Sequence, residues 1–517
     1  MFQNEVLSGL EVELNAVLKT NILIFFILIS KILRLKSMFK RKLSPNFHTN
    51  YHLFTLLVLV VGVVCSKFLM SLGLMLGGLG FLLELDFKSY RRNLQANRLF
   101  WWILAFYLLH FVALIWSENY EYGWNDIRVK FSLVGIALIS SSRAPFSKKS
   151  LTIFYVIFVL TLVISTIVNY VCYQFFGDKI LYVDIRDLSL FGSHIRFGIL
   201  IALGVSANYF LWNLVPKMRW FWFLSTLWLT FYTYYSQVLS GVISLAVVVF
   251  VLLIWELYQR KRWGIMSATI LFFVGAMILV ISYLSQPLQK KSAFSENQET
   301  LKHEWDKRSS ISFDTLDLKK QQIRFTLERY LISKRLPIRG DGVLKLTQTD
   351  IENIEKGNAD INEMRPGLTA RLYGLRYQIH HSKNPNGHSL LERLEYWKTA
   401  ISIIKENWLI GVGTGDVNAS FLKKYEEINS PLLEERRLRA HNTYLTETVT
   451  FGIVGLLFFI TWLSFYFYKQ LKFKQLFGII FILVAAVTFA FEDTLETQMG
   501  ITFFALFYSI FSRKMES

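Results

Sequence analysis

The sequence is poor in cysteine, which restricts the ways in which the fold can be held together. Its 517 residues include only two cysteines, Cys65 and Cys172, and each lies inside an apolar run. This pattern argues against a disulfide framework and says nothing about the redox compartment. We therefore expect both thiols to be packing residues.

Repeats, and charges within the long apolar runs, are also scarce. No internal repeat with a period of about 20–50 residues is evident, and no inverted repeat of the transporter kind is visible. The apolar runs are nearly free of charged residues, whereas an anion path through a transporter needs charges deep within several membrane helices. The sequence therefore favours a site outside the apolar core.

Apolar and aromatic residues are abundant instead. They make up 53% and 16% of the chain, and soluble domains usually contain about 45–50% apolar residues. Runs of about 17–25 apolar residues are long enough to cross a bilayer. Allowing for short or split runs, the sequence predicts an all-α integral membrane protein with about twelve transmembrane helices, near 52–66, 68–85, 99–117, 128–142, 150–174, 194–213, 219–235, 237–257, 263–284, 442–468, 474–491 and 497–512.

Residues 1–50 form an N-terminal extension to this core. They contain a further apolar run at 21–36, which Lys31 and Arg34 interrupt. We expect this run to lie on the membrane surface or to form an extra membrane helix.

The net charge of +18 is distributed unevenly among the connecting loops. Five loops are basic, at 86–98, 143–149, 214–219, 258–263 and 469–474, and three are neutral or acidic, at 117–126, 175–193 and 491–497. The positive-inside bias places the basic set in the cytoplasm. Helices one to nine (51–284) and ten to twelve (441–517) then enclose one large external loop, 285–440. Because the basic residues divide between the cytoplasmic loops and this external loop, nucleic acid is not expected as a partner.

The external loop is too long for a simple connection, and loops of this size are usually functional. We expect 285–305 to be loosely structured and 313–335 to be helical. Ser389, with Glu392 three residues later, has the pattern of a capping box. Arg393 follows in the first turn of a predicted amphipathic helix that ends at Gly411, with apolar residues at Leu390, Leu394, Trp397, Ile401 and Ile404.

The run 411-GVGTGD-416 resembles a phosphate-binding loop only superficially, because it lacks the lysine and follows a helix instead of a strand. Gly411, Gly413 and Gly415 are better explained by a tight turn that lets the backbone approach a ligand or another helix closely.

These motifs together resemble the O-antigen ligase and polymerase family. The resemblance rests on Arg393 and Trp397 in RLEYWKTA, on 408-WLIGVGTGD-416 and on 441-HNTYLTETVTFGIVGLL-457. Further similarity lies in 125-NDIRVKFSL-133, 193-SHIRFGIL-200 and 492-EDTLETQMG-500, which are in the style of Bacteroidetes members. It covers most of the chain from about residue 52.

The resemblance implies an architecture, a location and a reaction. It implies a GT-C-like glycosyltransferase architecture in the bacterial inner membrane, with the active site facing the periplasm. It also implies a role in lipopolysaccharide biosynthesis, through transfer of a glycan from an undecaprenyl-diphosphate-linked donor. The enzyme would be an inverting glycosyltransferase without metal or other cofactor, and membrane lipids would surround it.

One departure from the family concerns an arginine. Members commonly carry Ser-Arg at the outer end of a middle membrane helix, where this chain has 239-LSGVISL-245. Gly241 occupies the place of that arginine, so one contact to an anionic ligand is missing there. Arg196 is the candidate to supply an equivalent charge.

Stabilising a leaving diphosphate suits guanidinium groups, which stay charged and offer a planar fork of donors to phosphate oxygens. The candidates for diphosphate binding are Arg196, Arg393, Arg439 and Arg128. Each has a simpler explanation. Arg393 lies between Glu392 and Glu395, as a solvated surface charge would, and arginines at helix ends can extend to the membrane interface.

His441 is the candidate base that removes the acceptor proton, because imidazole titrates near neutral pH. The nearby Arg436, Arg437 and Arg439 would favour its neutral form by charge repulsion. The alternative is that His441, beside Asn442, merely caps the helix that follows. Glu492 and Asp493 could be only helix-initiating acids.

The sequence thus predicts a catalytic pair, His441 and Arg393, in an O-antigen ligase whose acceptor is lipid A-core. The first alternative is a repeat-unit polymerase of the same family, whose acceptor is a growing glycan. Two other classes remain: a transporter or flippase of anionic lipid-linked glycans, and a membrane scaffold or receptor with an external binding domain.

Overall fold

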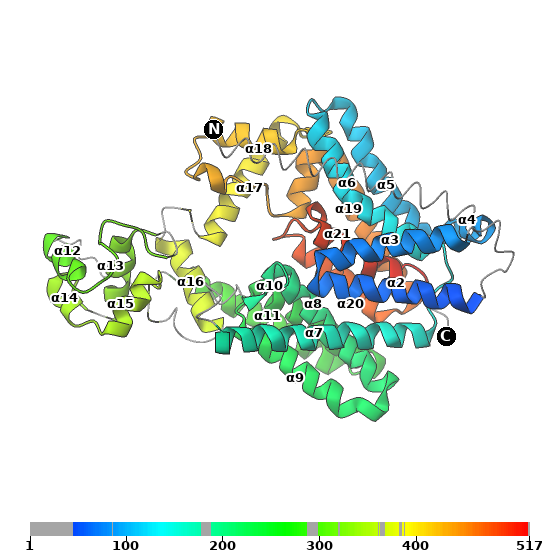
Figure 1. The fold of residues 1–517 in the computed structure, drawn as a ribbon, viewed down its shortest axis with the longest axis horizontal. Helices are drawn as coiled ribbons and strands as arrows, with labels where there is room; N and C mark the ends of the chain where they lie inside the picture. The colour runs from blue at the N-terminus through cyan, green and yellow to red at the C-terminus, as the bar shows by residue number, and fades with distance from the viewer. Residues whose placement is uncertain are drawn as a thin grey trace.

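The computed structural model describes residues 45–84, 86–176, 188–286, 298–318, 321–334, 336–359, 361, 368–381, 385–386 and 388–514. Within these ranges the named elements are all helices, and an isolated β-bridge joins Leu316 to Gln322. The apolar run at 21–36 lies outside the described residues. Figure 1 shows a bundle of long helices with a smaller lobe standing off at one end.

Each of the twelve predicted apolar runs falls on a helix. These helices are α2 (Pro45–Cys65), α3 (Lys67–Glu84), α5 (Arg98–Ala113), α6 (Tyr120–Ser141), α7 (Lys148–Phe176), α8 (His194–Leu214), α9 (Arg219–Tyr235), α10 (Leu239–Gln259), α11 (Trp263–Ser285), α19 (Thr443–Phe473), α20 (Leu476–Thr488) and α21 (Gln498–Ile510). The basic loop 86–98 also contains a short helix, α4 (Phe87–Ala96).

Among the described residues, eight helices are long and apolar enough to cross a membrane: α2, α3, α5, α7, α8, α10, α11 and α19. The other four fall short for identifiable reasons. Helices α20 and α21 have 13 residues each and α9 has 17, and α6 carries four charged side chains in its first half. The protein is therefore an all-helical, polytopic chain, and a total of twelve spans stays a prediction.

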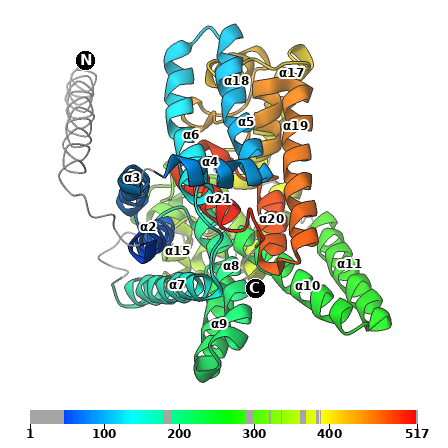
Figure 2. The ribbon, with the colours of Figure 1, turned by 90° about the vertical axis from the view of Figure 1, so that its right-hand side faces the viewer.

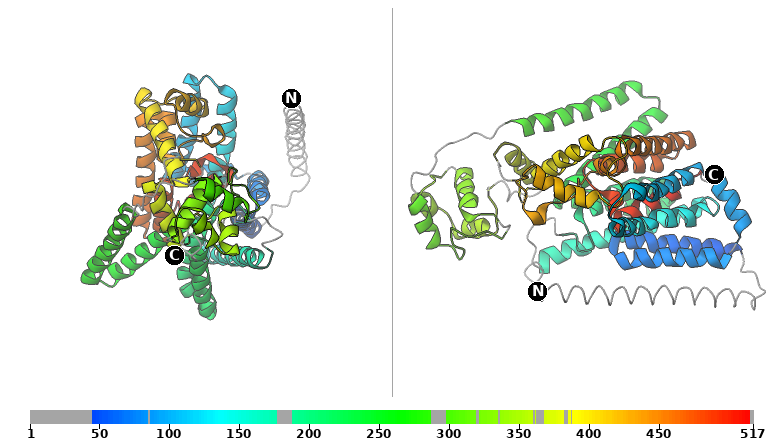
Figure 3. Two further views of the ribbon diagram at one scale, coloured as in Figure 1. Left: turned by 90° about the vertical axis from the view of Figure 1, so that its left-hand side faces the viewer. Right: turned by 90° about the horizontal axis from the view of Figure 1, so that it is seen from above.

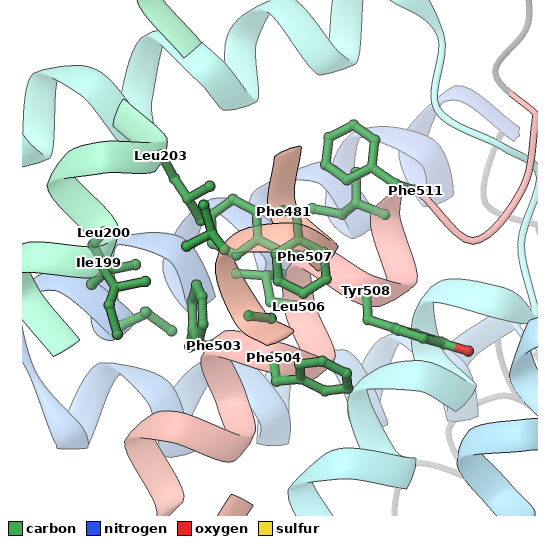
Figure 4. Packing of buried hydrophobic residues seen from close by; sticks show 14 of the residues in the cluster. Ile199, Leu200, Leu203, Phe481, Phe503, Phe504, Leu506, Phe507, Tyr508 and Phe511 are labelled. Atoms are coloured by element: carbon green, nitrogen blue, oxygen red, sulfur yellow. The ribbon is translucent and has the colours of Figure 1, made fainter. Parts of the chain in front are cut away.

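Aromatic side chains fill the centre of the bundle. Helices α20 and α21 are buried at almost every position, as expected of short helices that are apolar all round. Figure 4 shows Phe503 of α21 close to Ile199 and Leu200 of α8. The rings of Phe503, Phe504 and Phe507 all contact that of Phe481 of α20, at centroid distances of 5.9, 5.6 and 5.9 Å. This core fixes the two ends of the connection from α20 to α21, which matters for the site below.

The segment between α11 and α19 contains α12 (Gln298–Asp306), α13 (Ile323–Ser333), α14 (Gly340–Leu344), α15 (Gln348–Glu355), α16 (Leu368–His381), α17 (Ser389–Glu406) and α18 (Val417–Glu427). The expectation of loose structure up to residue 305 is wrong from Gln298 onward, where α12 begins. The predicted helix at 313–335 is shorter, Ile323–Ser333. Helices α12 to α15 enclose a core of their own around Trp305 and Tyr330, and the right-hand view in Figure 3 shows them as a separate lobe.

Helices α17 and α18 pack instead against the bundle. Figure 2 groups them with α5, α6 and α19. The predicted capping box of α17 is wrong, because His388 is the N-cap residue and makes no side-chain cap hydrogen bond. The predicted buried face is also partly wrong. Leu394 and Ile401 are exposed, whereas Tyr396, Ala400 and Ile403 are buried.

The glycine run 411–415 joins this layer to a kink in α19. Gly452 has a φ of +65° inside α19, and the chain beside it donates hydrogen bonds from Val412 N to Val449 O (2.9 Å) and from Gly413 N to Thr450 O (3.0 Å). A Cβ on Gly411, whose φ is +71°, would lie 2.4 Å from the carbonyl carbon of Thr450. Two backbones therefore meet here where no side chain fits.

Gly411→Ala is expected to destabilise the protein by at least about 1–2 kcal/mol, the cost of a left-handed conformation at a residue with a Cβ, because the clash with Thr450 adds to it. Gly275→Ala is the matched control, since a Cβ on Gly275 has nothing within 4 Å. Thermal unfolding of both variants in one detergent measures the difference. Equal melting temperatures for the two variants would contradict the close approach.

Candidate functional site

The connection between α20 and α21, residues 489–497, holds three acidic side chains that point to three different partners. We call this segment the acidic turn. Glu492 pairs with Arg196, Asp493 accepts hydrogen bonds from the chain around His441, and Glu496 pairs with Arg439 and Lys130. Three segments that are far apart in sequence thus meet at one turn.

Asp493 fixes the backbone at His441. Its carboxylate accepts hydrogen bonds from the backbone N–H of His441 (2.9 Å) and Asn442 (3.0 Å), and from the hydroxyl of Thr446 (2.8 Å). His441 has a φ of +47°, a conformation that residues with a Cβ rarely adopt. The contacts of Asp493 offset the cost of this conformation. In the sequence Asp493 could be only a helix-initiating acid, whereas the structure places its carboxylate against the backbone at His441.

Asn442, and not His441, caps α19. The side-chain oxygen of Asn442 accepts a hydrogen bond from Leu445 N (3.1 Å), and its amide donates to Ala490 O (2.9 Å). The capping alternative for His441 is therefore wrong. Its imidazole is left available for another role.

The imidazole of His441 lies against α17. Its ring centroid is 5.6 Å from that of Tyr396, and its Nδ1 is buried without a hydrogen-bond partner among the described residues. The indole of Trp397 donates to Ala440 O (3.0 Å), which holds α17 against this part of the chain. Burial, aided by Glu392, raises the pKa of Tyr396 to about 12, so the phenol beside the imidazole stays neutral.

Arg393 lies one turn of α17 before Tyr396. Its NH1 group donates to the backbone oxygen of Ser389 (2.9 Å), and its buried Nε has no partner. No carboxylate pairs with it among the described residues, because Glu392 is taken by Arg436 at 2.6 Å. Arg393 therefore keeps its positive charge uncompensated by an ion pair.

Arg439 is placed differently. It donates to Glu496 at 2.6 Å and to the phenol of Tyr122 at 3.3 Å. Burial alone would raise the pKa of Glu496, but the charges of Lys130 and Arg439 outweigh it and lower the pKa to about 2. The carboxylate is therefore ionised at neutral pH, and it neutralises part of the charge that Arg439 could offer to a ligand.

Lys130 completes this ion-pair network and was not among the predicted site residues. Its side chain is 2% exposed and lies 2.9 Å from Glu496 and 2.7 Å from Asp126. Glu447 of α19 is buried too, with one carboxylate oxygen that has no partner among the described residues. The spacing of Asp126 and Lys130, four residues apart on a helix, was the signal that could have found the pair.

Arg128, a predicted ligand, lies on the other side of α6. It is exposed and donates to Asn125 Oδ1 at 2.6 Å. The structure does not bring it to the acidic turn, because residues two apart on a helix point in different directions.

Arg196 lies in the first turn of α8 and donates to Glu492 at 2.9 Å. The place of the missing family arginine is nearby. A Cβ on Gly241 of α10 would lie 3.1 Å from the Cα of Gly198, and Ser240 donates to Ile195 O. Helices α8 and α10 therefore touch backbone to backbone just where the arginine would stand, and Arg196 sits on the facing turn.

The described residues contain no group of three or more His, Cys, Asp or Glu side chains arranged to hold a metal ion. The carboxylates of the acidic turn contact arginine, lysine or backbone N–H groups instead. The imidazole of His441 therefore lies on a fixed segment of backbone and contacts Tyr396 of α17. The guanidinium of Arg393 is one helical turn away from Tyr396 on the same helix.

Comparison with known families points the same way. Residues 224–460 match the model of the family described as O-Antigen ligase. The matched stretch contains Arg393, the glycine run and His441, whereas the acidic turn lies beyond it. A comparison with curated proteins found no match. The family model supports the predicted resemblance to the O-antigen ligase and polymerase family, and the apolar helices are those of a polytopic membrane protein.

Proposed function

We propose that this protein transfers a glycan from an undecaprenyl-diphosphate-linked donor to an acceptor hydroxyl, at the periplasmic face of the bacterial inner membrane. The observation that carries the proposal is the packing of His441 on α17, where Arg393 has no acidic partner among the described residues. A base and a free cation are the two groups that such a transfer needs. The family match supports glycan-transfer chemistry of this type.

In this proposal the diphosphate of the donor meets Arg393 first. A guanidinium without a carboxylate partner retains its full charge for phosphate oxygens. Arg196 and Arg439 also lie at this site, but each already pairs with a carboxylate of the acidic turn. They help to orient the diphosphate, but their carboxylate partners neutralise part of their charge. Arg196, two residues before the contact of Gly198 with Gly241, is proposed to supply the charge of the family arginine.

His441 removes the proton of the acceptor hydroxyl. The acceptor oxygen forms a bond to the anomeric carbon while the bond from that carbon to the phosphate oxygen breaks. Undecaprenyl diphosphate leaves with the electron pair, and inversion at the anomeric carbon follows from a single displacement. The proton stays on the imidazole until solvent takes it. No metal is needed in this scheme, because arginine supplies the positive charge.

The acceptor is proposed to be lipid A-core, which makes the protein an O-antigen ligase. The alternative, a polymerase, would use the end of another lipid-linked repeat. Deletion of the gene followed by electrophoresis of the cell's lipopolysaccharide separates the two. Loss of all attached polymer supports the ligase, and a single attached repeat supports the polymerase. An unchanged profile contradicts both.

The buried ion pairs between α6 and the acidic turn make a flippase the second candidate, because charges inside membrane helices often line ion or substrate paths. Asp126, Lys130 and Glu496 contact one another closely, as a structural network does. Reconstituted vesicles test this: flipping of a lipid-linked glycan that persists in His441→Ala, without any transfer, would favour the flippase.

Arg393→Ala is expected to lower the rate of glycan transfer by about tenfold to a hundredfold, since a charge-assisted contact to phosphate of roughly 1.5–3 kcal/mol is lost. Arg393→Lys should recover only part of the activity, because lysine cannot bind in a bidentate way. Lys398→Ala, an exposed cation on the same helix, is the control. A transfer rate in Arg393→Ala equal to that of the control would overturn this assignment.

A further inference from the structure

A hollow of about 700 Å³ lies beside the glycine run. Its walls come from the turn between α5 and α6, the connection from α17 to α18, and the first half of α18. The side chains that define it are Trp116, Glu118, Asn407, Trp408, Ser420 and Lys423. It is separate from the acidic turn and from His441, neither of which contributes to its lining.

Two tryptophans give the hollow an aromatic wall. Trp408 is 60% exposed, and the indole N–H of Trp116 is buried without a hydrogen-bond partner among the described residues. An indole combines a flat apolar face with one polar group. Sugar rings present the complementary surface, with C–H groups on one face and hydroxyls at the edge.

Polar groups of the same lining are free to bind hydroxyls. Within the described part of the chain, no hydrogen bond engages the carboxylate of Glu118, the side-chain oxygen of Asn407 or the hydroxyl of Ser420. Asp416 is not available, because its two oxygens accept from Glu118 N (2.8 Å) and Asn119 N (2.9 Å). The free polar groups of the hollow are therefore mainly hydrogen-bond acceptors, which suit the hydroxyl donors of a sugar.

The charge of the hollow argues against a phosphate as its ligand. The lining contains three carboxylates, of Glu118, Glu406 and Asp416, and one cation, Lys423. The neighbouring Lys424 is engaged by Glu406 and Glu427. A neutral saccharide fits this balance better than a lipid phosphate.

The hollow is coupled to the catalytic region through α19. Val412 N donates to Val449 O, and Ile453 N donates to Trp408 O (2.8 Å). Val449 lies six positions after Thr443, which is close to His441 in the sequence. Six positions correspond to a rise of about 9 Å along a helix. A glycan of a few sugars that reacts at His441 can reach this distance.

We propose that the hollow is a saccharide subsite, which binds sugar residues of the donor glycan that are distal to the diphosphate. The inference rests on the proposed function, because it places the reacting sugar at His441. It adds a role for Trp408 and Trp116: they discriminate donors by glycan length. The subsite contributes binding of the glycan and takes no part in the chemical step.

The test uses the full-length protein in lipid nanodiscs with two donors, one carrying a single sugar and one carrying the complete repeat unit on undecaprenyl diphosphate. Trp408→Ala should lower kcat/KM for the complete donor about tenfold, mainly through KM, a loss that corresponds to about 1.4 kcal/mol. It should leave the single-sugar donor within about twofold. Trp408→Phe should recover most of the loss, since it keeps an aromatic face.

Trp220→Ala is the matched control, because Trp220 is 75% exposed and lies outside the hollow on α9. An equal effect of Trp408→Ala on both donors, or no effect on either, would overturn the subsite. Failure of the subsite and failure of the proposed function are distinguished by a binding measurement. The oligosaccharide is released from the donor by mild acid, and calorimetry measures its affinity for the protein. Binding that Trp408→Ala weakens, in a protein that transfers nothing, supports the subsite and refutes the transfer. Binding that is absent from the wild-type protein refutes the subsite.

Discussion

Cells that carry His441→Asn in place of the wild-type protein should accumulate lipid-linked glycan and lose transferred glycan. The expected fall in transfer rate is about 10²–10⁴-fold, the usual contribution of a general base. Asparagine is the replacement of choice because it tolerates the positive φ of His441. The fold should therefore survive while the base is lost.

The control for this experiment is His303→Ala, which removes an exposed histidine of the separate lobe. Equal amounts of both variants in the membrane, measured by immunoblot, show that abundance does not explain the result. Normal transfer in His441→Asn would show that the imidazole is only a packing group against Tyr396.

Lys130→Met is expected to cause the largest loss of stability. Lys130 is buried and lies between Asp126 and Glu496. Methionine would leave Asp126 without its cation and Glu496 with Arg439 alone, close to the buried Glu447. Removing one partner of a buried ion pair costs about 3–5 kcal/mol. The variant should unfold at a much lower temperature than the wild-type protein, or fail to accumulate.

Arg128→Met provides a close comparison, because it removes a cation two residues away on the same helix. Arg128 is exposed and contacts Asn125, so its loss should change stability by no more than about 0.5 kcal/mol. Melting temperatures of the two variants in one detergent measure the difference. If Arg128→Met were as damaging as Lys130→Met, the described packing of α6 would be wrong.

The sequence predicted the helices well because apolar runs are a local property. It also singled out His441, Arg393 and the glycine run as candidates, since each lies in a short motif. It did not predict that Asp493 holds the chain at His441 or that Glu496 pairs with Lys130. Those contacts join residues 52 and 366 positions apart, and only the packing of α20 and α21 brings them together.

Helix rotation was the other limit. The rotation of α6 determines whether Lys130 or Arg128 is buried. The two cations lie two residues apart in NDIRVKFSL, and the sequence does not distinguish them. The same applies to α17, where Leu394 and Ile401 are exposed and Tyr396 is buried. Apolar periodicity assumes that the buried face is the apolar one, and that assumption is weak for a helix beside a membrane.

The central claim is that this protein itself moves the glycan and that His441 acts in that step. Purified protein in nanodiscs, given lipid-linked glycan and acceptor, tests it by the amount of undecaprenyl diphosphate released. The account predicts release by the wild-type protein only when acceptor is present, and almost none from His441→Asn at equal donor binding. No release by the wild-type protein, or equal release by both proteins, would contradict it.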